Sequence, residues 1–344
     1  MRKFFSAFFK KIGEMLEKAD LQTMPEEKSV IVFDEVPSPK VKEKQGKSIQ
    51  TTTKKEIIPY PDNPIRDIID LMEFPFLALS KDRRSPIVYE SADGTQKIKI
   101  SRHTGHFLAS IYDWDIILIA AGKIQEILNN GSEIPSCTIS IPRHELLKAL
   151  HKQGGKKQQK DLEKSLDRLQ LTGISTTVNN KDYRHRAGFG FVDRWGYSER
   201  KNARETRKIQ ITLSPWLYEL CCAQGGLLKS NISYFDITSD LKKFLYRTAR
   251  KHAGKNKDGW KFSTETLYKK SDSEREFKKF KSDLKAAVQD DDIPEYSMEW
   301  VEESGKTLVG FKRSKLHELE RLGEECEKLQ EKTLAFNNLQ EYDE

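Results

Sequence analysis

The spacing of apolar residues between positions 113 and 213 alternates between the helical period and the two-residue period of a strand. Asp113 and Gly131 are expected to begin and end the first predicted helix. The stretches are, in chain order, the helix "WDIILIAAGKIQEILNNG", the strand "CTISI", the helix "PRHELLKAL", the helix "KKQQKDLEKSLDRLQLTG", and the strands "ISTTV", "GFGFVD" and "RKIQITLS". The basic turn "NNKDYRHRA" joins the first two of these last strands. This order, with a basic second helix and a hairpin with a basic tip, is typical of a winged helix-turn-helix domain.

The same order of elements recurs in the second half of the chain. The stretches there are the helix "YFDITSDLKKFLYRTARKHAG", the strand "WKFS", the helix "TETLYKK", the helix "EREFKKFKSDLKAAV" and the hairpin "YSMEWVEESGKTLVGFKR". In the basic helix, the residues expected to face inward are Phe277, Phe280, Leu284 and Val288. The sequence therefore predicts an α+β fold with tandem winged helix-turn-helix domains, at residues 66–225 and 226–315, with an N-terminal extension and a C-terminal helix.

Three segments lie outside these domains. Residues 1–20 predict an amphipathic helix with a phenylalanine-rich face, which could dock on a partner protein, lie on a membrane surface or pack on its own domain. Residues 21–65 lack apolar periodicity and read as a disordered linker. Residues 316–344 predict an acidic helix or tail that packs on the body of the protein.

The charge distribution narrows the class of partner. The net charge of this 344-residue chain is +7. Residues 142–208 hold 17 Lys and Arg against eight Asp and Glu, and residues 242–285 hold 15 against six, so that each block carries +9. Residues 286–344 hold seven against 16, a net −9. Two basic blocks favour an anionic partner such as nucleic acid. The four cysteines have no metal-ligand spacing, and no apolar run has membrane-spanning length, which together favour a reduced, cytoplasmic protein.

The basic helices are the candidate double-stranded DNA contacts, because the second helix of a helix-turn-helix enters a groove lined with phosphates. Arg275 is the predicted base contact, since an arginine can donate two hydrogen bonds to a base edge, while the lysines are expected to hold phosphates. Ser273 is expected near the start of the helix, where backbone N–H groups bind phosphate. The candidates of the first domain are Lys156, Lys157, Lys160, Lys164, Arg168, Lys181, Arg184 and Arg186. Those of the second are Lys269, Lys270, Ser273, Arg275, Lys278, Lys279, Lys281, Lys285 and Lys306.

Catalytic motifs do not emerge from the sequence. The histidines lack the spacing of a nuclease metal site, and "SGKT" lacks the first glycine of a phosphate-binding loop. His252 is expected to favour the dipole at a helix end. We therefore expect a non-enzymatic protein without a metal or cofactor.

Several blocks, in the same order, resemble the replication initiator protein A family of bacterial plasmids over about residues 73–313. They are "FPFLALSKDRRSPIVYE", "IYDWDIILIAAGKI", "LDRLQLTGISTTV", "SPWLYEL" and "YFDITSDLKKFLYRTARKHAG" followed by "GWKF". The resemblance implies an initiator that binds origin iterons, recruits a host replication initiator and helicase, and forms an inactive homodimer. A winged-helix transcriptional repressor without a replication role and a rolling-circle origin nuclease are the alternatives.

Overall fold

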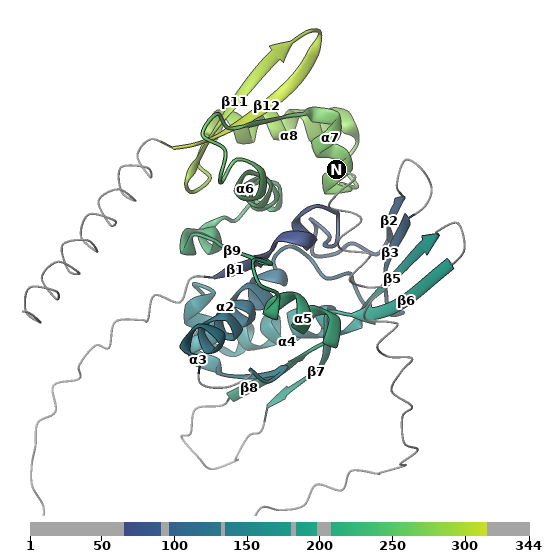
Figure 1. The fold of residues 1–344 in the computed structure, drawn as a ribbon, viewed down its shortest axis with the longest axis vertical. Coiled ribbons are helices and arrows are strands. Elements are labelled where there is room, and N and C mark those ends of the chain that lie inside the picture. The colour runs from purple at the N-terminus through teal and green to yellow at the C-terminus, as the bar shows by residue number, and fades with distance from the viewer. Residues whose placement is uncertain (1–64, 91–95, 132–134, 180–183, 198–207, 315–344) are drawn as a thin grey trace, which may run out of the picture. The chain divides into compact units, whose positions relative to one another are not determined.

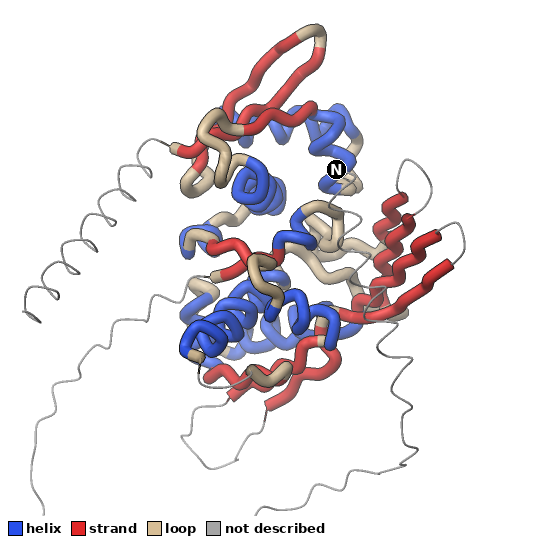
Figure 2. Tube along the Cα trace, in the orientation of Figure 1, coloured by secondary structure: helices blue, strands red, loops and turns tan. Residues whose placement is uncertain are grey.

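The computed structural model describes residues 65–90, 96–131, 135–179, 184–197 and 208–314 (Figure 1). The predicted N-terminal helix and acidic tail lie outside these residues, as does the predicted linker except for Ile65, which is buried. All described residues belong to one compact unit of the chain. They form helices and strands in similar measure, as Figure 2 shows, so the fold is a mixed α and β one.

The first helix-and-sheet unit has one helix, one strand, two helices and two strands. These are α2 (Trp114–Asn130), β4 (Thr138–Pro142), α3 (Arg143–Ala149), α4 (Lys156–Leu171), β7 (Val192–Tyr197) and β8 (Lys208–Leu213). Strand β8 lies between β4 and β7, antiparallel to both. Helix α2 ends as the sequence predicts, at Gly131 in the left-handed conformation.

The second helix-and-sheet unit repeats this order. It consists of α6 (Asp240–His252), β10 (Trp260–Ser263), α7 (Thr264–Ser271), α8 (Phe277–Asp290), β11 (Tyr296–Glu303) and β12 (Lys306–Arg313). Strand β12 lies between β10 and β11, as β8 lies between β4 and β7. The two units therefore share both the order of their elements and the order of their strands.

A separate antiparallel sheet, which we call the inserted sheet, combines two strands that precede α2 with two strands that lie between α4 and β7. Its strands, in spatial order, are β2 (Ile87–Glu90), β3 (Gln96–Arg102), β5 (Thr172–Asn179) and β6 (Arg184–Gly190), and they lie side by side in Figure 1. The sequence assigned the hairpin with the basic turn, here β5 and β6, to the first unit itself. The structure corrects this, because β4, the strand after α2, pairs with β8, and β8 pairs in turn with β7.

The chain leaves this sheet at Phe191, where the sequence predicts one continuous strand. The Gly190 carbonyl accepts hydrogen bonds from the Ser214 hydroxyl (2.7 Å) and the Trp216 indole (2.6 Å). Phe191 is fully buried, with its ring 5.3 Å from that of Trp114. Gly190 is the last residue of β6 that pairs with β5, and the carbonyl of Phe191 accepts a hydrogen bond from the Ser214 backbone N–H at 3.1 Å, so the chain passes from here into the other sheet.

The remaining elements connect the two units. They are β1 (Arg66–Ile68), the 3-10 helix η1 (Ile69–Met72), α5 (Pro215–Cys222), β9 (Leu227–Lys229) and the 3-10 helix η2 (Ile232–Asp236). Strand β1 pairs antiparallel with β9. The segment at residues 66–73 thereby comes to lie against α6, although the two are far apart in the sequence.

A row of three buried ion pairs joins α6 to the N-terminal part of the described chain. Lys243, Arg247 and Lys251 are four residues apart, so they share one face of the helix. Their nitrogens lie 2.9, 2.6 and 2.8 Å from carboxylate oxygens, in the same order. The partners are Asp115 on α2, Asp67 on β1 and Glu73 after η1. We call these three pairs the α6 ion-pair row.

Neighbouring groups make further contacts with two of these pairs. Asp67 also accepts hydrogen bonds from the Trp114 indole (3.0 Å) and the Ile68 backbone N–H (2.9 Å). The Lys243 ammonium lies 3.9 Å from the centroid of the Tyr234 ring. Burial raises the pKa of Asp115 to about 6, and Lys243 opposes this rise.

The α6 ion-pair row predicts a large loss of stability when one partner is removed. Lys243→Met leaves the Asp115 carboxylate buried without its cation, so the free energy of unfolding should fall by about 3–5 kcal/mol. The double variant Lys243→Met/Asp115→Leu should recover most of this loss, because it removes both charges. Urea titration followed by circular dichroism measures each value. Lys257→Met is the control, since Lys257 is exposed, and equal losses in the single and double variants would contradict the assignment.

Candidate nucleic-acid interface

Helix α8 has one buried apolar face and one exposed basic face. Phe280, Leu284 and Val288 are buried, as the sequence predicts. Phe277 differs, since 36% of it is exposed and its ring packs 5.3 Å from that of Tyr268 rather than in the core. The reason is that the helix begins at Phe277 itself, so this residue lies at its edge.

The cations of α8 point away from this apolar face to different degrees. Lys278, Lys279 and Lys285 are exposed, and Lys279 pairs with Asp283 one turn later at 2.7 Å. Lys281 is half-buried and donates a hydrogen bond to the Thr307 hydroxyl at 2.9 Å, which ties α8 to β12. Lys269, at the end of α7, and Lys306, at the start of β12, are exposed.

Arg275 is not placed as a base contact requires. It precedes α8, and its Nη2 lies 3.0 and 2.8 Å from the two carboxylate oxygens of Asp240. Its Nε lies 3.6 Å from Asp283. The guanidinium therefore holds the loop before α8 to the first turn of α6. This corrects its predicted role, since the same donors cannot bind a base edge while Asp240 and Asp283 hold them.

Ser273 also has a local role. The backbone N–H of Arg275 donates to the Ser273 hydroxyl at 3.2 Å. Because α8 begins only at Phe277, Ser273 lies in the loop rather than at the helix start that the sequence predicts.

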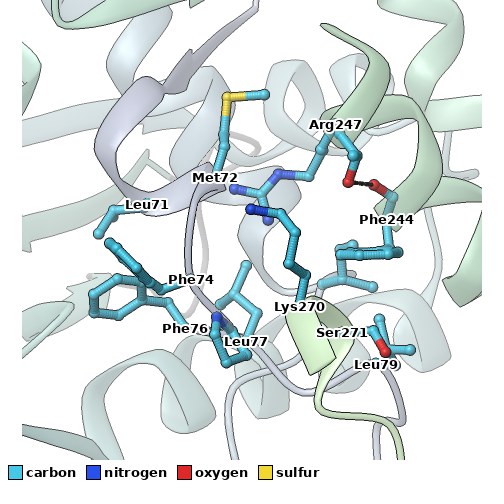
Figure 3. A pocket seen from close by; sticks show the side chains of 13 residues that line it. Leu71, Met72, Phe74, Phe76, Leu77, Leu79, Phe244, Arg247, Lys270 and Ser271 are labelled. Atoms are coloured by element: carbon cyan, nitrogen blue, oxygen red, sulfur yellow. Dashed lines mark hydrogen bonds between the residues drawn. The ribbon is translucent and has the colours of Figure 1, made fainter. Parts of the chain in front are cut away.

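Lys270 points into the protein rather than towards solvent. Its ammonium lies 2.8 Å from the Glu73 carboxylate and also donates to the Glu73 carbonyl at 2.9 Å. Figure 3 shows Lys270 and Arg247 directed into the same pocket, which the apolar residues Leu71, Met72 and Leu77 also line. Burial alone would raise the pKa of Glu73, but Lys270 and Lys251 outweigh it and lower the pKa to about 2.

His252 belongs to the same cluster. Its Nε2 lies 3.6 Å from a Glu73 oxygen. Burial, followed by the charges of Lys270 and Lys251, lowers the pKa of His252 to about 4. The imidazole is therefore neutral at pH 7, and it does not supply the positive charge that the sequence predicts at this helix end.

Helix α4 presents most of its predicted cations to solvent. Lys156, Lys157, Lys160 and Lys164 are exposed, and the opposite face buries Leu162, Leu166 and Leu169. Within the described part of the chain, these four lysines take part in no ion pair shorter than 4 Å. They form a cationic face on the helix that corresponds to α8 in the first unit.

Arg168 departs from this face. Its Nε and Nη2 lie 2.8 and 2.6 Å from the two oxygens of Asp113, a carboxylate with no exposure to solvent. Asp113 also accepts hydrogen bonds from the Ser110 backbone N–H and hydroxyl, both at 2.8 Å. Arg168 therefore joins α4 to the start of α2, and the structure corrects its prediction as a DNA contact.

The hairpin candidates are only partly visible. Lys181 lies outside the described residues, and Arg184 is described only as a backbone position in β6. Arg186, also on β6, is exposed.

Internal carboxylates bind more than half of the cations in the second basic block. Eight of its 15 Lys and Arg residues form ion pairs. They are Lys242, Lys243, Arg247, Lys251, Lys261, Lys270, Arg275 and Lys279. The net charge of +9 in this block therefore overstates the charge available to a partner. Besides Lys278 and Lys285 on α8, its exposed cations include Lys269 on α7 and Lys255 and Lys257 in the loop between α6 and β10.

The sequence profile of the family described as "Replication initiator protein A" matches residues 66–298. The chain belongs to the replication initiator protein A family. This confirms the resemblance seen in the sequence. A relative from Wigglesworthia glossinidia brevipalpis, described as "Putative replication protein", is 31% identical over 238 residues, which cover 68% of this chain and 84% of the relative.

Among solved structures, this family member is similar to domains 2 and 3 of RctB. The TM-score is 0.51 at 14% identity, and the match covers 70% of this chain and 96% of that one. At this identity the likeness concerns the fold alone. In the described residues of this family member, every helix is too short or too polar to cross a membrane.

The cluster around Glu73 predicts a pH effect that depends on His252. The pKa of the His252 imidazole is about 4 in the folded protein and near 6.5 in the unfolded chain. The unfolded state therefore holds more protons between these values, and the stability from this group falls as the pH drops from 6.5 to 4, by up to about 1.4 kcal/mol per pH unit. Urea titrations of the wild type and His252→Gln at several pH values isolate this contribution. Their stability difference should change across the window, and a constant difference would contradict the lowered pKa.

Proposed function

We propose that this chain initiates plasmid replication by binding iteron repeats of the origin as double-stranded DNA. One observation supports this most directly. Each helix-and-sheet unit has a third helix, which is α4 in the first unit and α8 in the second. This helix buries an apolar stripe and exposes lysines on its other side. A repeat of that arrangement suits a protein that lays two helices on one duplex.

In this proposal each unit is a winged helix-turn-helix domain. Helices α4 and α8 enter successive major grooves, and the hairpins β7–β8 and β11–β12 lie beside them along the backbone. Lys306 begins β12, and Lys269 lies in the last turn of α7, so both stand at positions that could neutralise phosphates. The exposed lysines release counterions on binding, which makes the affinity depend steeply on salt.

Base recognition on α8 then belongs to residues other than Arg275. Lys278, Ser282 and Lys285 are exposed and are spaced by four and three residues, so they share one face of the helix. The Ser282 hydroxyl can bond to several bases, whereas Lys278 and Lys285 beside it are expected to hold phosphates.

In this proposal the α6 ion-pair row fixes the position of the second unit relative to the first. Because it joins the second unit to α2 and β1 through buried charges, α4 and α8 would meet the duplex at a fixed separation. Binding energy could then bend the DNA and loosen an adjacent AT-rich segment. A host replication initiator and helicase would complete the opening in the cytoplasm. We propose no catalytic step for this chain, and a homodimer as its inactive form.

Footprinting on the DNA that flanks the gene tests this function. Protection of several direct repeats beside an AT-rich tract, with replication of a plasmid that carries them, is the expected result. Protection of a promoter that does not support replication would favour the winged-helix repressor. Nicking of supercoiled DNA in the presence of a divalent metal would favour the origin nuclease and overturn the proposal.

The lysines of α8 provide a quantitative prediction. Lys278→Ala/Lys285→Ala should reduce the slope of log affinity against log salt by about 2, close to 0.9 for each lost phosphate contact. Fluorescence anisotropy with the footprinted duplex measures the slope. Lys255→Ala/Lys257→Ala is a control with the same change in charge, in the loop between α6 and β10. If the wild type, the α8 variant and the control variant have equal slopes, α8 does not belong to the interface.

A further inference from the structure

The inserted sheet, made of β2, β3, β5 and β6, has one buried face and one exposed face. Ile87, Ile98, Ile100, Ile174 and Thr176 are each no more than 2% exposed and cover the core. Their neighbours along the strands point the other way, because side chains alternate across a sheet. This second side, which we call the outer sheet face, includes the candidate Arg186 but no residue of α4 or α8.

Strand register aligns the residues of the outer sheet face in two rows. One row runs Val88, Lys99, Ser175, Gly188 across β2, β3, β5 and β6. The next runs Glu90, Lys97, Thr177, Arg186 across the same strands. Lys97, Lys99, Ser175, Arg186 and Gly188 are all exposed. The two rows thus place three cations around a centre of small residues.

A carboxylate offsets only part of this charge. Glu90 is the acidic side chain of these two rows, and it lies 3.3 Å from Lys97. Within the described residues, Lys99 and Arg186 form no ion pair shorter than 4 Å. They differ in this from Arg168, Lys270 and Arg275, whose charges are satisfied inside the protein.

The glycines at the centre of this face are not required by the fold. A Cβ added at Gly188 would meet only the Ile174 carbonyl oxygen, at 4.0 Å, and one at Gly173 only the Ser101 carbonyl oxygen, at 3.9 Å. Neither glycine has a positive φ. Glycine weakens a strand, so these residues come at a cost that packing does not explain. They let another chain approach the sheet closely between the cations.

We infer that the outer sheet face binds the phosphate backbone of duplex DNA beyond the segment that α4 contacts. Helix α4 continues into β5 without a break, since it ends at Leu171 and β5 begins at Thr172. The Thr172 hydroxyl also accepts a hydrogen bond from the Ala109 backbone N–H at 2.8 Å, which anchors the start of β5. The face is therefore held rigidly beside a proposed DNA-binding helix, and the inference rests on that proposed function.

The chemistry of the face favours duplex DNA over other anionic partners. Single strands are held mainly by stacking on aromatic rings, and none of the described residues in the two rows is aromatic. Protein partners need apolar or aromatic anchors at the centre of an interface, whereas the centre here is Ser175 with Gly173 and Gly188. Cations beside small polar residues suit a backbone contact that carries no sequence information.

Two variants test the inference with two probes. The probes are the footprinted duplex and the same duplex extended by about two helical turns, or about 20 base pairs, on each side. Lys99→Ala/Arg186→Ala should reduce the salt slope by about 2 on the extended duplex and leave it unchanged on the short one. Gly188→Val should leave the fold intact by circular dichroism, since valine suits a strand, but weaken binding to the extended duplex several-fold.

The outcomes separate this inference from the proposed function. The α8 variant Lys278→Ala/Lys285→Ala should weaken binding to both duplexes. If it does so while the sheet variants bind the extended duplex as the wild type does, the inference is wrong and the proposed function stands. If neither set of variants changes duplex binding, the inference is wrong and α8 does not belong to the interface. If the sheet variants bind a single-stranded oligonucleotide more weakly but bind the duplexes as the wild type does, the inference is also wrong.

Discussion

The α6 ion-pair row is the contact on which the arrangement of the described chain depends. Three cations on one helix face meet three carboxylates, which come from α2, from β1 and from Glu73 after η1. A buried pair of this kind adds little stability compared with apolar packing, but breaking it leaves an uncompensated charge in the interior. The second unit therefore has one strongly preferred position on the first. For a protein with two proposed DNA-binding helices, this position sets the distance between the DNA segments that they reach.

Positive residues in this family member fall into two physical groups. Arg168, Arg247, Lys243 and Lys270 lie inside, where carboxylates hold them at hydrogen-bonding distance. The lysines of α4, the outer lysines of α8 and the cations of the inserted sheet lie in water. Only the second group can exchange counterions for phosphates, so only this group contributes to the salt dependence of DNA binding. The net charge counted along the sequence does not distinguish the buried, paired cations from the exposed ones.

The passage of the chain at Phe191 divides the strands between two sheets and with them the proposed roles. Strands β7 and β8 complete the first unit, in the position that β11 and β12 hold in the second. Strands β5 and β6 instead join β2 and β3 in a sheet with no counterpart in the second unit. The basic hairpin that looks like a wing in the sequence is therefore an additional surface. This difference explains how two units with the same element order can present different surfaces to DNA.

The sequence by itself determined the elements whose signal is local. The leucine stripe at 162, 166 and 169, the stripe of Phe280, Leu284 and Val288, and the stop at Gly131 all appear where periodicity and glycine geometry placed them. The order of the sequence blocks was likewise enough to indicate the family that the profile match confirmed. Only the tertiary structure decided which cations are available, because their partners are distant in the chain. Arg247 and Asp67 are 180 positions apart, and Arg275 and Asp240 are 35 apart. Nothing in the local spacing of a lysine or arginine records a partner that folding brings to it.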